Sequence, residues 1–180
     1  MKSLCKQSNR KAFYSVYEQQ ITSEVKTATR YFTAWLALIL FKRGWSTESV
    51  GKCIRAYNNW FRAVNNHTAD NESGCTLDDI KAELKSRYGY EVTLSNSLIP
   101  DGAAQISDAV GYSMDVCLNL LATTAALTLF DLDRPVGTVN RTMQAFDARI
   151  KFYKAGDKDY QHILSELRNK YHFCLELEVS

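Results

Sequence analysis

Proline and glycine are scarce in this sequence. Among its 180 residues there are two prolines and eight glycines, whereas 46% of the residues are hydrophobic. Proline and glycine interrupt helices and strands, so their scarcity argues against a disordered chain or one made mostly of loops. A chain of this length can bury one substantial hydrophobic core. We therefore expect residues 1–180 to form a single compact domain.

The chain also lacks an excess of charge of either sign. It has 22 basic and 20 acidic side chains, which gives a formal net charge of +2. A charge this small creates no overall field that would hold the protein on nucleic acid or on an anionic membrane. Any binding to nucleic acid must then come from a local basic patch.

The cysteines form no metal-binding or disulfide pattern. All five stand apart, at positions 5, 53, 75, 117 and 174, without a CxxC pair and without a histidine at zinc-ligand spacing. This usage predicts reduced thiols. The N-terminal sequence MKSLCKQSNRKAF contains no apolar segment of the kind found in secretory signals. We therefore expect a cytoplasmic protein.

Long hydrophobic runs are absent as well. The two most apolar stretches, residues 31–41 and 116–130, are shorter than the roughly 18 to 20 residues that cross a bilayer. We interpret both as buried helices of the core. No membrane partner is expected.

No catalytic or phosphate-binding motif is recognisable. The patterns G-x-S-x-G, GxxxxGK[ST] and GxGxxG do not occur. Of the three histidines, His67 is expected in a solvated loop, His162 on an exposed helix face and His172 in a structural position at the start of a strand. Asp131 and Asp133 could hold a cation, but two carboxylates are thin coordination. We therefore expect a protein that is not an enzyme and that binds no metal or cofactor.

Helical periodicity is what the sequence has in abundance. Apolar residues recur every three or four positions in three stretches, at about 10–43, 47–64 and 76–87. Gly44 ends the first stretch, Ser46 or Thr47 can cap the second helix, and Thr76 with Asp79 forms a capping box for the third. After Gly89, residues up to Leu94 alternate between apolar and polar side chains, as a half-buried strand does.

The second half of the chain repeats this order. Adding 89 to residues 17–64 superposes the apolar positions of the two halves, and adding 83 does the same for residues 84–94. We therefore predict a mainly α fold with an internal duplication, in which units 10–94 and 101–179 each have three helices and a short strand. The alternative is that any two amphipathic helices align by their periodicity.

The duplication also predicts how the two short strands pair. An isolated strand leaves its backbone donors and acceptors without partners. Strands 88–94 and 172–179 are therefore expected to form a small β-ribbon across a pseudo-twofold axis.

One helix face carries the residue types of a binding surface. Four polar residues follow steps of three and four positions off the apolar stripe, and a tryptophan stands at the corner before them: Lys52, Arg55, Asn59, Arg62 and Trp45. Arginine and aromatic side chains are typical anchors of protein interfaces. The same face could grip phosphates and present arginine and asparagine to base edges. A charged helix face can also simply be solvated.

A helix-turn-helix that reads DNA is therefore the alternative function. Lys42 and Arg43 add positive charge at the same corner, and LALILFKRGWSTESVGKCI has the rhythm of that motif. However, the helix before the turn is longer and more apolar than the motif requires. The matching corner in the second half, FDLDRPVGTVNR, carries two aspartates as well as two arginines.

Residues 40–94 contain LFKRGWSTESVGKCIRAYNNWFRAV, a polar loop and TLDDIKAELKSRYGYEV. An apolar helix that ends in glycine plus an aromatic residue, a helix with arginine and aromatic residues, and L-D-D-I-x-x-x-L before a glycine are features shared with one group of proteins. In these features the chain resembles small uncharacterised helical accessory proteins of Gram-positive phages and prophages.

The resemblance implies a biological setting, that of a phage or prophage protein acting in its host. It supplies no catalytic residue. Such phage proteins often act by stoichiometric contact with a host protein or nucleoprotein complex, and inhibitors of bacterial defence such as anti-CRISPR proteins are one class of them. A near-neutral chain would occlude or lock such a complex rather than mimic DNA. The sequence thus predicts a monomeric or homodimeric binding protein, located in the host cytoplasm if a phage encodes it.

Overall fold

The computed structural model of the chain describes residues 2–65, 76–95 and 106–175, with side chains at 19, 21–61, 76–95 and 113–175. This part of the chain forms α1 (Lys2–Lys42), α2 (Thr47–Asn65), α3 (Leu77–Tyr88), α4 (Ile106–Asp131), α5 (Val136–Lys154) and α6 (Tyr160–Tyr171). The prediction of a mainly α protein is confirmed. Helix α1 begins earlier than predicted, because residues 2–10 contain neither proline nor glycine and continue the helix beyond its apolar stripe.

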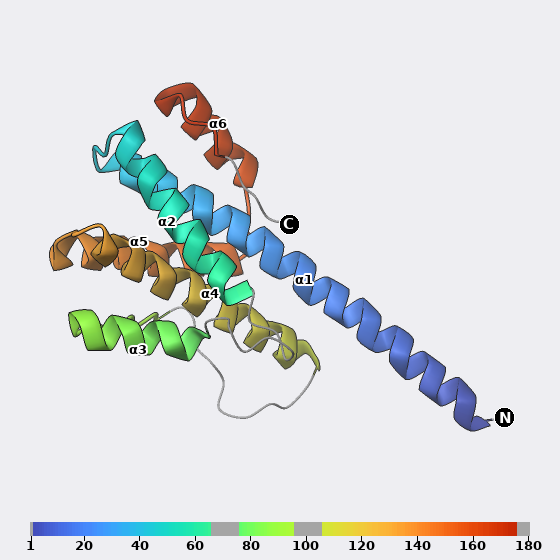
Figure 1. Cartoon of the computed structure of the whole chain (residues 1–180). Helices are drawn as coiled ribbons and strands as arrows, with labels where there is room; N and C mark the ends of the chain where they lie inside the picture. Colours follow the sequence, from blue (N-terminus) through green and yellow to red (C-terminus); the bar gives the residue numbers. More distant parts are fainter. Residues whose placement is uncertain (1, 66–75, 96–105, 176–180) are drawn as a thin grey trace.

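The two longest helices, α1 and α4, pack against each other and carry the remaining helices (Figure 1). Helices α2 and α5 each contact both of them. The short helix α3 lies on α4, and α6 lies on α1. Figure 1 also shows the first part of α1 extending away from the other helices towards the N-terminus.

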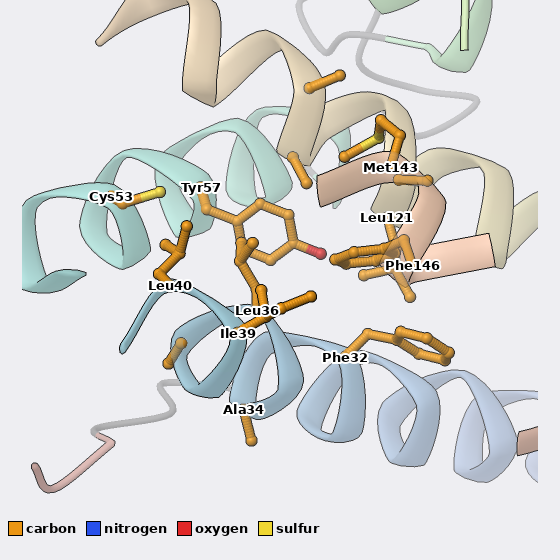
Figure 2. Packing of buried hydrophobic residues seen from close by; sticks show 14 of the residues in the cluster. Phe32, Ala34, Leu36, Ile39, Leu40, Cys53, Tyr57, Leu121, Met143 and Phe146 are labelled. Atoms are coloured by element: carbon orange, nitrogen blue, oxygen red, sulfur yellow. The ribbon is translucent and has the colours of Figure 1, made fainter. Parts of the chain in front are cut away.

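The core lies where α1, α2, α4 and α5 meet. Figure 2 shows Tyr57 of α2 reaching in between Leu36 of α1, Leu121 of α4 and Phe146 of α5. All four side chains are fully buried. Burying large apolar side chains from both halves of the sequence in one cluster is what joins the halves into one body.

Helices α1 and α4 each end in a turn of the same type. The N–H groups of Trp45 and Arg134 each donate to the carbonyl five residues earlier, at 3.1 and 3.0 Å. The residue before each of them adopts a left-handed conformation, with φ of 80° at Gly44 and 54° at Asp133. Glycine adopts this conformation without strain, and aspartate tolerates it better than most residues. Ser46 then caps α2, as predicted, because its Oγ accepts the N–H of Ser49 at 3.2 Å.

Helices α3 and α6 also begin and end alike. Thr76 and Asp79 form the predicted capping box at the start of α3, while the carboxylate of Asp159 caps α6. Gly89 and His172 follow the two helices with φ of 60° and 52°. His172 is therefore a structural C-cap residue, as expected.

Aromatic contacts hold each short helix, α3 or α6, on the long helix of the other half. Tyr88 stacks on Phe130 of α4 with 4.7 Å between ring centroids, and Tyr90 meets the same ring edge-on at 5.1 Å. Tyr171 stacks on Phe41 of α1 at 4.7 Å, and Phe173 meets it edge-on at 5.2 Å. Phe41 and Phe130 are 89 positions apart, and Tyr88 and Tyr90 are 83 positions from Tyr171 and Phe173, respectively, as the duplication predicts. The duplication remains a proposal, which these paired contacts support.

The predicted β-ribbon is wrong. Within the described part of the chain, residues 89–95 and 172–175 form no strand, and residues 176–179 of the second expected strand lie outside that part. The apolar side chains of each segment face a helix instead, with Tyr90 on α4 and Phe173 on α1. Alternation along a segment shows that one side is buried, but it does not identify what buries it.

One stretch of α4, Ser113–Asp131, is long and apolar enough to cross a membrane by length and composition, with a mean hydropathy of 1.4. In the structure 67% of this stretch is buried inside the protein. The central helix of a bundle meets the same criteria. The run at 116–130 therefore lies in a core helix, as expected.

Candidate contact surfaces

Helix α2 has one buried and one exposed face. Val50, Cys53, Ile54, Tyr57 and Phe61 point into the core. Three of the predicted contact residues, Lys52, Arg55 and Asn59, are exposed on the opposite face. The structure thus brings these three together on α2.

The charges on this face are partly compensated. Lys52 pairs with Glu48 one turn earlier, at 2.7 Å between Nζ and Oε1. The hydrogen bond and the charge of Lys52 lower the pKa of the Glu48 carboxyl. Arg55 forms no ion pair with any described side chain. Its guanidinium is therefore the cation on the described part of the face that no ion pair neutralises, and its charge also helps to lower the pKa of the Glu48 carboxyl.

The other two predicted contact residues are placed differently. Trp45 is half-buried at the corner before α2, and the guanidinium carbon of Arg134 lies 4.2 Å from the centroid of its ring. One ring face of Trp45 is thus already occupied. The side chain of Arg62 lies outside the described residues.

Two further cations at the corner are tied into the bundle rather than added to the α2 face. Lys42 pairs with Glu166 of α6 at 3.2 Å. Arg43 donates to the hydroxyl of Thr142 at 2.6 Å and to the carbonyl of Arg141 at 2.5 Å, both in α5. Burial, followed by the charge of Arg141, lowers the pKa of Arg43. The sequence suggested one basic cluster, but its cations have separate partners. Lys42 is bound to α6, Arg43 to α5, and Lys52 to a residue of α2 itself.

The carboxylate of Asp131 is not a cation site, because protein donors surround it. It accepts the hydroxyl of Tyr88 at 2.8 Å and the indole N–H of Trp60 at 3.1 Å, and it pairs with Arg87 at 3.2 Å. These contacts join α2, α3 and α4. Asp133 is exposed and occupies the left-handed position after α4. No group of three or more potential metal ligands occurs in the described residues.

A cluster that the sequence analysis missed lies between α1 and α5. The guanidinium carbon of Arg149 is 4.9 Å from the ring of Trp35, 5.2 Å from that of Tyr31 and 5.9 Å from that of Phe152. Arg149 also pairs with Asp157 at 3.1 Å. Phe152 is 54% exposed, which is unusual for a large apolar side chain. The i, i+3 spacing of Arg149 and Phe152 is visible in the sequence, but only the fold brings Trp35 to them.

The described thiols differ in accessibility. Burial raises the pKa of both Cys53 and Cys117 to about 12. Because the thiolate is the nucleophilic form, these two residues are unreactive near neutral pH. Cys174 is exposed and free.

No protein-family model, curated protein sequence or solved structure matches the chain. The resemblance of residues 40–94 to phage accessory proteins therefore stays a prediction. The same holds for the cytoplasmic location.

Proposed function

We propose that this chain is a non-enzymatic protein that acts by stoichiometric contact with a protein or nucleoprotein complex through the exposed face of α2. The observation that supports the proposal most directly is the position of Arg55 and Asn59, which are exposed and one turn apart. Arginine on a rigid helix is a frequent anchor of protein interfaces. The core residues on the opposite side of α2 hold this helix in a fixed orientation.

The resemblance of residues 40–94 extends this proposal to a biological setting. It favours a phage or prophage protein that works in the host cytoplasm. Within that setting, inhibition of a defence complex such as CRISPR–Cas is the role we propose. The small net charge of +2 favours occlusion of such a complex over mimicry of nucleic acid.

A DNA-binding regulator is the second candidate. It is favoured by the sharp turn between α1 and α2 and by Arg55 and Asn59, which are residue types that read guanine and adenine. Affinity for DNA, however, comes largely from cations that neutralise phosphates. Lys42, Arg43 and Lys52 are engaged within the protein. We therefore rank DNA binding second.

The test is an affinity capture from bacterial lysate with the tagged protein, with and without nuclease. We expect one protein or nucleoprotein at near-equal stoichiometry, unchanged by nuclease and lost with Arg55→Glu. The matched control is Lys26→Glu, which reverses an exposed charge on α1 and should leave capture intact. Nucleic acid alone, released as salt is raised, would replace the proposal by the DNA-binding candidate.

A further inference from the structure

A groove of about 290 Å³ lies between α3 and the segment that follows it. Leu84, Tyr90 and Val92 supply its apolar lining, and Lys81, Lys85 and Glu91 line it with charged side chains. Leu84 is buried, whereas Val92 and Tyr90 are only half-buried. An apolar side chain of a ligand could therefore gain burial here.

Beyond Tyr90, the backbone beside this groove has no hydrogen-bond partner among the described residues. The N–H of Tyr90 donates to the carbonyl of Leu84 at 3.4 Å and completes the end of α3. From Glu91 to Leu94, by contrast, no backbone N–H or carbonyl forms a hydrogen bond with another described residue. Such a row of unpaired groups is a template on which an extended peptide can add as a strand.

The charges around the groove favour an acidic ligand. Lys85 is neutralised by its ion pair with Glu91. Lys81 is exposed and pairs with no described carboxylate. The groove thus has one uncompensated positive charge. A carboxylate of a bound peptide would complement this charge.

We propose that this groove binds an extended acidic peptide segment of a partner protein. The peptide pairs its backbone with residues 91–94, places an apolar side chain against Leu84 and Val92, and directs a carboxylate to Lys81. This surface is separate from the exposed face of α2, and the proposal does not depend on that face.

The second half of the chain differs from the first at the positions that match Lys81 and Glu91. At the spacing of 83, Leu164 stands where Lys81 is, and Cys174 stands where Glu91 is. The matching region after α6 therefore lacks a counterpart of Lys81, and its cation is Arg168, which stands where Lys85 is.

The test uses the full-length protein and a library of fluorescein-labelled octapeptides in which valine, isoleucine or leucine alternates with glutamate, threonine or lysine. Fluorescence anisotropy measures the affinity of each peptide. We expect saturable binding of one glutamate peptide per chain, and binding roughly five- to tenfold weaker when lysine replaces glutamate. N-methylation of alternate peptide amides should abolish binding, because it removes the donors that pair with residues 91–94.

Two variants of matched charge locate the site. Lys81→Glu should weaken the binding of glutamate peptides and strengthen the binding of lysine peptides, while Arg55→Glu should change neither affinity. The proposal is overturned if no peptide of the library binds, if acidic peptides have no advantage, or if Lys81→Glu has no effect in a variant that keeps its melting temperature. Dimerisation that competes with the peptide would assign the groove to a second copy instead. A failure of the α2 proposal would leave all these results unchanged.

Discussion

Replacing Asp131 by alanine is expected to lower the free energy of unfolding by about 2–4 kcal/mol. The carboxylate accepts hydrogen bonds from Tyr88 and Trp60 and pairs with Arg87, so it connects three helices. Hydrogen bonds to a charged group contribute about 1.5–3 kcal/mol when they are protected from water. Because the Asp131 side chain is 24% exposed, the two bonds are each reduced to about 1–2 kcal/mol.

The pair with Arg87 adds little to this sum. The Arg87 side chain is 47% exposed, and exposed ion pairs contribute between zero and about 1 kcal/mol. For a chain of 180 residues, a loss of 2–4 kcal/mol corresponds to a melting temperature lower by roughly 5–15 °C. The neighbouring variant Asp133→Asn is the control, since Asp133 is exposed and asparagine also tolerates its left-handed backbone.

Urea denaturation followed by circular dichroism gives the free energies, and a double-mutant cycle with Trp60→Phe isolates one contact. Phenylalanine keeps an aromatic ring but removes the N–H donor, so the cycle should show a coupling energy of about 1 kcal/mol. The reasoning fails if Asp131→Ala unfolds with the same free energy as Asp133→Asn. It also fails if calcium or magnesium raises the melting temperature of the wild-type protein but not of Asp131→Ala, because Asp131 would then be a cation ligand.

Three further outcomes are expected. Tyr153→Phe should stabilise the protein by up to about 1 kcal/mol in urea denaturation, because the Tyr153 hydroxyl is buried without a hydrogen-bond partner among the described residues; a loss of stability would show that a partner exists. His172→Gly should raise the free energy of unfolding by about 1 kcal/mol and Gly89→Ala should lower it by about 1 kcal/mol, because both positions have positive φ, which glycine adopts without strain. Two changes of the same sign would contradict this. Cys53 and Cys117, with pKa values raised to about 12, should resist iodoacetamide at pH 8 until the protein unfolds, as peptide mass spectrometry can check; rapid labelling of the native protein would refute their burial.

Local features of the helices could be predicted from the sequence. Ser46 or Thr47 was predicted to cap the second helix and Thr76 the third, and Ser46 and Thr76 do so. Gly44 and Gly89 were predicted as helix ends. Capping and the left-handed turn depend on residues within a few positions of one another. The exposure of Lys52, Arg55 and Asn59 could be predicted for the same reason, since helical periodicity separates the two faces of α2.

The tertiary structure decided which segments and charges meet. The alternation at 88–94 correctly indicated a half-buried segment, but a ring on α4, Phe130, covers it rather than a second strand. The sequence placed Arg43 in a basic cluster, but in the structure its guanidinium is hydrogen-bonded to α5. Periodicity describes the environment of each residue along its own element, whereas the partner comes from an element far away in the sequence. The sequence by itself therefore determined where the helices lie and which faces they bury, and only packing between them decided which cations remain free and which backbone groups remain unpaired.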